Sequence, residues 1–182
     1  MSKKITDMVY IAIGTALLVV CSWMALPSAI PITMQTFAIF TVLGMLGGRN
    51  GNAAILIYVI LGAMGLPVFS HFKGGLAIIF NDPAGGYIIG FIVMALVYWF
   101  AEIMFGKSLT VRIISMVIGL AVCYIIGTLW YVRLNLHVHV SVGFVSALTM
   151  CVTPFVIPDL AKLALSVLVV QKMKKHLSVI KR

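Results

Sequence analysis

An acidic and a basic residue stand three positions apart inside a long apolar run of the sequence. Asp159 and Lys162 lie within residues 142–170, a stretch long and apolar enough to cross a bilayer. Positions i and i+3 of a helix share one face, and a charge near the centre of a membrane helix costs about 2.5–3.5 kcal/mol on insertion scales. Two such groups on one face indicate a polar pocket inside a helix bundle. The alternative is an ion pair that only locks helices together.

Pro158 stands directly before this acidic residue and favours the pocket. A proline leaves a carbonyl of the preceding helical turn without its usual partner. Membrane helices tolerate this best where a cavity or a neighbouring helix satisfies that carbonyl.

The composition determines the class of protein that must position these residues. Hydrophobic residues make up 63% of the 182 residues and charged residues only 9%, whereas soluble domains are about 25% charged. The mean hydropathy is +1.18. We therefore expect an all-α integral membrane bundle, a single domain over residues 1–182, with room for about six transmembrane helices.

The apolar runs and their breaks predict where the six spans lie. We expect a first span at about residues 5–25 and a loop with two prolines after it. Gln35 opens the second span, which ends at the glycine-rich turn 47–52, and the third is a short span over 53–66. The others are a fourth ending near residue 105, a fifth over about 113–131, and the sixth, which holds Asp159. Residues 70–84 are read as a loop that folds over the bundle or dips into it.

The basic residues predict the orientation. With both termini in the cytoplasm, ten of the thirteen Lys and Arg residues fall in cytoplasmic segments, as the positive-inside rule requires. This distribution also explains the net charge of +9 without a nucleic-acid partner. The acid–base pair then lies toward the outer half of the last span. The ten residues are Lys3, Lys4, Arg49, Lys107, Arg112, Lys172, Lys174, Lys175, Lys181 and Arg182.

Other candidate motifs carry less chemistry. Residues 106–108 read Gly-Lys-Ser, but position 101 is alanine, so no nucleotide-binding loop is complete. His137 and His139 are too few to hold zinc unaided, and we expect no metal site, no cofactor and no enzyme activity. Glu102, near the end of the fourth span, is expected at the membrane interface. Ala12 and Ala16 give the first span a small-residue face, suited to packing within the bundle or to docking a partner.

Four blocks in this order resemble the BioY family, the biotin-specific substrate-binding subunits of energy-coupling factor transporters. They are residues 31–37 (PITMQTF), 62–69 (GAMGLPVF), 83–91 (PAGGYIIGF) and 158–162 (PDLAK), and the likeness extends over nearly the whole chain. The resemblance implies six transmembrane helices in the cell membrane and high-affinity capture of biotin from outside. The implied partners are a membrane coupling subunit (the T subunit) and two cytoplasmic ATPases.

The resemblance also implies roles for particular positions. Asp159 and Lys162 would be polar ligand contacts on the last helix, and the face of Ala12 and Ala16 would dock the coupling subunit. The remaining candidates for ligand binding are Gln35, Asn81, Asp82, Gly85, Gly86 and Tyr87. The family commonly has glycine before and threonine after the proline of the third block, where this chain has Asp82 and Ala84.

The chemistry of biotin fits these residue types. Its carboxylate needs a cation or donors, its ureido ring needs an acceptor and a donor, and its apolar rings and tail need apolar walls. Lys162 could face the carboxylate or the ureido carbonyl, and Asp159 or Asn81 could accept from the ureido N–H groups. Tyr87, Phe72 and Trp23 are candidates for the wall, although such aromatics are more often packing residues.

A second function is compatible with the same residues. The chain could be a stand-alone secondary transporter of a small carboxylate, with a proton or sodium ion coupled through Asp159. Many such folds contain an inverted repeat, and no convincing internal repeat is visible in this sequence.

Overall fold

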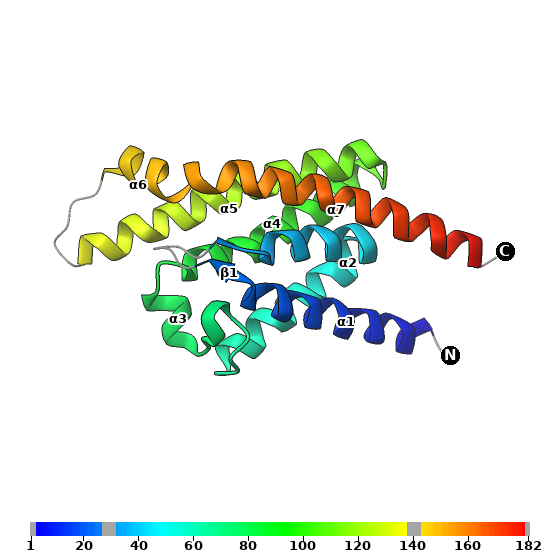
Figure 1. The fold of residues 1–182 in the computed structure, drawn as a ribbon, viewed down its shortest axis with the longest axis horizontal. Coiled ribbons are helices and arrows are strands. Elements are labelled where there is room, and N and C mark those ends of the chain that lie inside the picture. The colour runs from blue at the N-terminus through cyan, green and yellow to red at the C-terminus, as the bar shows by residue number, and fades with distance from the viewer. Residues whose placement is uncertain (1–2, 27–31, 138–142, 181–182) are drawn as a thin grey trace.

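Long helices make up most of the chain in the computed structural model, which describes residues 3–26, 32–137 and 143–180. They lie side by side, with both chain ends at one end of the bundle and α3 and α6 at the other (Figure 1). The expected all-α class is confirmed, apart from two short strands. In chain order the elements are α1 (Lys3–Trp23), β1 (Ala25–Leu26), β2 (Ile32–Thr33), α2 (Gln35–Ala63), the 3-10 helix η1 (Ser70–Phe72), α3 (Leu76–Asn81), α4 (Gly85–Phe105), α5 (Leu109–His137), α6 (Phe144–Cys151) and α7 (Thr153–Ile180).

Within the described residues, four helices are long and apolar enough to cross a membrane. They are Lys3–Trp23, Gly85–Phe105, Leu109–Leu136 and Thr153–His176. Many large apolar side chains point outward from them, among them Met8 and Phe105, which are 68% and 72% exposed. Apolar outer faces on most helices are typical of a multi-pass membrane protein.

The second and third predicted spans are two halves of α2. The sequence suggests a six-residue turn at 47–52. In the structure only Gly47 departs from helical geometry within α2 (φ 77°, ψ 174°), and the chain is helical on both sides of it. A Cβ added at Gly51 would lie 3.1 Å from the Cα of Leu43, although eight residues of straight helix span about 12 Å. The halves therefore fold back on each other, as the path of α2 in Figure 1 shows.

The last predicted span is also divided. The apolar run 142–170 contains the short helix α6 and the start of α7, and the two meet at Val152 (φ −117°, ψ −45°). Pro154 explains the break, because it has no N–H to donate to the carbonyl of Met150 and its ring would clash with that carbonyl. α7 then continues through Pro158.

α2 lies at the centre of the bundle, and α1, α4 and α7 all pack against it. α5 packs closely along α4, where Gly90 faces Cys123 and Gly119 faces Met94. The strands add a short antiparallel pair that joins α1 to α2, with Ala25 opposite Thr33. This packing brings the starts of α2, α4 and α7 together beside the middle of α5.

Candidate ligand-binding site

A cavity of about 430 Å³ lies where these four helices meet, beneath the segment that joins α2 to α4. Its volume falls in the range of small-molecule sites. The predicted loop 70–84 supplies part of its wall, and its other residues come from α2, α4, α5 and α7, from β2 (Thr33) and from Phe69, just before the loop. The lining consists of Thr33, Gln35, Thr36, Phe69, Ser70, His71, Lys73, Ile78, Asp82, Pro83, Ala84, Tyr87, Ile88, Phe91, Leu120, Cys123, Tyr124, Phe155, Asp159 and Lys162.

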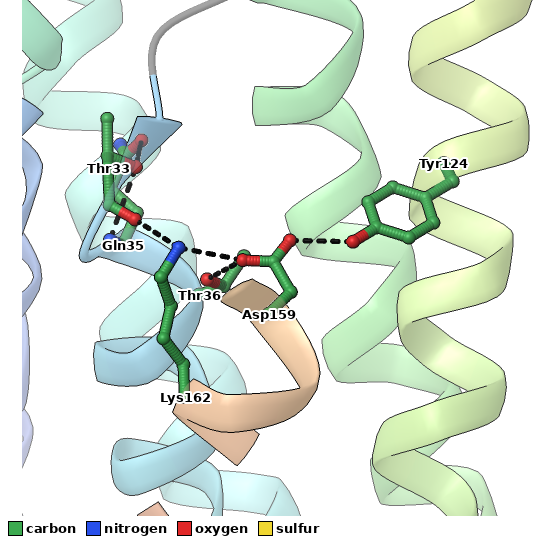
Figure 2. Close-up of polar contacts among 6 residues, drawn as sticks. All are labelled: Thr33, Gln35, Thr36, Tyr124, Asp159 and Lys162. Atoms are coloured by element: carbon green, nitrogen blue, oxygen red, sulfur yellow. Dashed lines mark hydrogen bonds and ion pairs between the residues drawn. The ribbon is translucent and has the colours of Figure 1, made fainter. Parts of the chain in front are cut away.

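The predicted acid–base pair lies in this lining, and Figure 2 shows its contacts. Asp159 is only 2% exposed. Its Oδ1 accepts hydrogen bonds from Lys162 Nζ and from the Thr36 hydroxyl, both at 2.8 Å, and its Oδ2 accepts one from the Tyr124 hydroxyl at 2.7 Å. Lys162 Nζ also donates to the carbonyl of Thr33 at 2.7 Å. The pair thereby joins α7 to both α2 and α5.

These contacts leave each partner some hydrogen-bonding capacity. An ammonium group has three N–H donors, of which Lys162 uses two within the protein. A carboxylate has about four acceptor sites, of which Asp159 uses three. The pair is thus both an ion pair between neighbouring turns of α7 and a donor and acceptor set on the wall of a cavity.

Gln35 also lines the cavity, and its amide is held from both sides. Its Nε2 donates to the hydroxyl of Tyr58, and its Oε1 accepts from the hydroxyl of Thr33 at 2.9 Å. The side chain is 7% exposed. Because both neighbours fix the amide, Gln35 presents its remaining donor and acceptor sites in one orientation.

Asp82 lies at the other side of the cavity, next to the start of α4. Its Oδ2 forms an ion pair with Lys73 at 2.8 Å, and its Oδ1 accepts from the backbone N–H of Ala84 at 2.9 Å. An Asp side chain that bonds the backbone two residues on stabilises a turn. This contact gives the Asp82 and Ala84 of this chain a structural role in the turn that precedes α4.

The other predicted residues of this region lie outside the lining. Asn81 is exposed at the end of α3. Gly85 and Gly86 are buried at points of close packing: an added Cβ would lie 1.9 Å from the carbonyl oxygen of Ile79 and 2.2 Å from Cβ of Trp130, respectively. Both glycines therefore let α3 and α5 approach the start of α4.

Of the three aromatic wall candidates, the structure brings only Tyr87 to the cavity, where its hydroxyl donates to the carbonyl of Cys151 at 3.2 Å. Trp23 and Phe72 are exposed and pack on each other, with ring centroids 4.9 Å apart. Sequence reasoning missed the walls formed by Phe69, Phe91, Tyr124 and Phe155. The available signals were that Phe69 and Phe91 each close one of the four blocks, and that Tyr124 puts a hydroxyl in the middle of a span.

Two further expectations concern other parts of the chain. Glu102 lies near the end of α4, where its side chain is 10% exposed and its carboxylate accepts a hydrogen bond from the N–H of Gly48, at which the second half of α2 begins. Its position at the membrane interface stays a prediction. The expectation about His137 and His139 falls on side chains outside the described part of the structure.

Known proteins match the chain over nearly its full length. The model of the BioY family matches residues 1–179. A biotin transporter BioY of Thermotoga maritima is 40% identical over 169 residues, which cover 90% of this chain and 92% of the relative. The biotin transporter BioY2 of Lactococcus lactis is 35% identical over 163 residues, with 88% and 86% covered.

A solved structure has the same fold. It is the crystal structure of the S-component for biotin from an ECF-type ABC transporter, and it matches with a TM-score of 0.81 over 96% of this chain and 95% of its own. The sequence identity is 24%. The match shows that the helices of this chain are arranged as in that structure.

Proposed function

This chain belongs to the BioY family, and we propose that it captures biotin as the substrate-binding component of an energy-coupling factor transporter. The family is one of transporters and not of enzymes. The observation that carries the proposal is the buried pair of Asp159 and Lys162 on the wall of a cavity of ligand size. We propose the cell membrane as its location.

The cavity offers the groups that biotin needs. Lys162 retains a donor and Asp159 an acceptor, and Gln35, at the start of α2, presents an amide held in one orientation. Phe69, Phe91 and other apolar side chains line the rest. Apolar walls with a few fixed polar groups are the usual composition of a small-molecule site. Tyr87 and Asp82 complete our proposed ligand-binding set on the α4 side. Asn81, Gly85 and Gly86 contribute to the site indirectly, because they fix the path of the chain from α3 into α4.

We propose six membrane crossings, with the two halves of α2 counted separately and both termini in the cytoplasm. The positive-inside distribution supports this orientation. In Figure 1 both chain ends lie at the end of the bundle away from α3 and α6. The cavity is lined by the segment around α3 and by residues near the starts of α4 and α7. The cavity would then open toward the outside, where biotin is captured.

The proposed partners are a membrane coupling subunit and two ATPases. Ala12 and Ala16 lie on an exposed face of α1, in an apolar groove that Met8, Val20 and Leu61 also line. Small residues in such a groove allow another helix to approach closely. We propose this groove as the contact with the coupling subunit.

Biotin binding by the purified protein tests this function. We expect detergent-purified protein to bind radiolabelled biotin without ATP or partners, and Asp159→Asn and Lys162→Ala to weaken binding by about tenfold or more, because each leaves a buried polar partner unsatisfied. Lys172→Ala removes an exposed lysine from the same helix and should bind like the parent. Failure of the parent protein to bind biotin would refute the ligand assignment. Ion-dependent accumulation of a carboxylate by proteoliposomes of the protein alone would favour a secondary transporter.

A further inference from the structure

A second, smaller pocket lies at the opposite end of the bundle from the cavity, between α2, α5 and α7. Its volume is about 30 Å³. Arg112, in the first turn of α5, and Lys174, near the end of α7, bring two cationic groups into its lining. Gln171 adds an amide, while Met116 and Val170 contribute to an apolar wall.

The charges of this pocket are not balanced within the described part of the chain, where no Asp or Glu lines it. Glu102 lies at the same end of the bundle and is close enough to interact electrostatically with Lys174. It does not line the pocket, however, and its carboxylate accepts a hydrogen bond from Gly48 N–H and lies 3.7 Å from Lys107 Nζ. Lys174 Nζ donates to the carbonyl of Gly44 at 2.6 Å, which occupies one of its three donors. Two cations therefore face the pocket with donors to spare.

One of these donors is buried without a partner. Arg112 Nε has no hydrogen-bond partner among the described residues. A buried donor without a partner is unfavourable, and more so when it belongs to a charged group. A guanidinium beside an ammonium suits an anion with several oxygens, above all a phosphate.

We propose that this pocket binds the phosphate of an anionic phospholipid. A volume of about 30 Å³ has room for about two groups of the size of a water molecule, such as phosphate oxygens, but not for a larger molecule. The apolar wall and the position at the ends of membrane helices place the remainder of such a ligand in the bilayer. The assignment to the cytoplasmic leaflet rests on the orientation proposed above, whereas the binding itself does not depend on biotin.

Native mass spectrometry of the full chain in detergent tests the proposal, with phosphatidylglycerol and phosphatidylcholine as probes. We expect the parent protein to retain phosphatidylglycerol in preference to phosphatidylcholine. Arg112→Gln and Lys174→Gln should each weaken retention by about tenfold, the effect of one charge-assisted hydrogen bond. Lys172→Gln, the same charge change two residues away on an exposed position of α7, should retain the lipid like the parent.

Two outcomes would overturn the proposal. Equal retention of phosphatidylglycerol by all four proteins would show that the pocket is not its site. A higher melting temperature of the parent with inorganic phosphate, together with equal retention of the two lipids, would identify a free anion as the ligand. Thermal melting of each preparation reports whether the variant has folded, and biotin binding, measured separately, tests the proposed function without reference to the lipid.

Discussion

The Asp159–Lys162 pair combines two roles that the sequence had presented as alternatives. The two side chains contact each other at 2.8 Å, as a bracing ion pair would. They also line a cavity, and each has hydrogen-bonding capacity that its protein partners leave unused. A pair that only stabilised the fold would not need to line a cavity of ligand size.

A double substitution separates these two roles. Lys162→Met alone leaves a buried carboxylate without its cation, so we expect a lower melting temperature, since breaking one partner of a buried pair costs about 3–5 kcal/mol. Asp159→Asn combined with Lys162→Met removes both charges and should recover much of that stability, yet biotin binding should remain lost. Thermal melting and biotin binding of the three proteins provide the measurement. A double variant that still bound biotin like the parent would show that the pair serves the scaffold alone.

Tyr124 is a residue that holds the carboxylate in place. Its hydroxyl donates to Oδ2 of Asp159 at 2.7 Å, so Tyr124→Phe removes one hydrogen bond to a charged group, worth about 1.5–3 kcal/mol. We expect biotin affinity to fall by about tenfold or more, with little change in fold, because the ring is kept. The matched control is Tyr131→Phe on the same helix, outside the cavity lining, and calorimetric titration with biotin would compare them. Equal affinities in the two variants would remove Tyr124 from the site.

At the level of the elements, the break at Gly47 determines the path of the chain through the bundle. Opposite charges sit on its two sides: Lys174 donates to the carbonyl of Gly44, and Glu102 accepts from the N–H of Gly48. A cation at the end of one helix and an anion at the start of the next both stabilise helix dipoles. The fold of α2 is therefore fixed by contacts from α4 and α7 as well as by glycine.

Gly47→Ala should destabilise this break. Its backbone (φ 77°, ψ 174°) lies in a region that is essentially restricted to glycine, and such strain costs about 1–3 kcal/mol. We expect a melting temperature several degrees below that of Asn50→Ala, a change at a helical position of the same segment. Differential scanning fluorimetry in detergent would compare the two variants. Equal melting temperatures would mean that the backbone at residue 47 can relax without cost.

The elements that sequence reasoning predicted well are those with long apolar runs, such as α1 and α4. Sequence reasoning missed the break before Pro154, because a continuous apolar run can form either one helix or two. It overestimated the turn at 47–52, since six glycine-rich or polar residues suggest a loop and only tertiary contacts show that Gly47 suffices. The acid–base pair was predictable because intramembrane charge is rare. The hydrogen bond from Tyr124 joins positions 35 residues apart and has no local signature.

At the scale of the whole molecule, the site and the proposed docking face use different surfaces. The cavity lies among α2, α4, α5 and α7, whereas the groove with Ala12 and Ala16 lies along α1 and the second half of α2. α1 packs mainly on α2 and touches η1 beside the cavity. Ligand capture and assembly with partners should therefore be separable by substitution.

Bulky residues on α1 test this separation. Ala12→Leu with Ala16→Leu fills the groove without touching the cavity lining, so purified protein should bind biotin as the parent does. Biotin uptake by cells that also express the coupling subunit and ATPases should fall by about tenfold or more, because a helix can no longer approach closely. Ala121→Leu, the same change on an exposed position of α5, controls for altered lipid contact. Normal uptake with both leucines would place the docking surface elsewhere, while lost biotin binding in the purified variant would mean that α1 and the cavity are coupled within the chain.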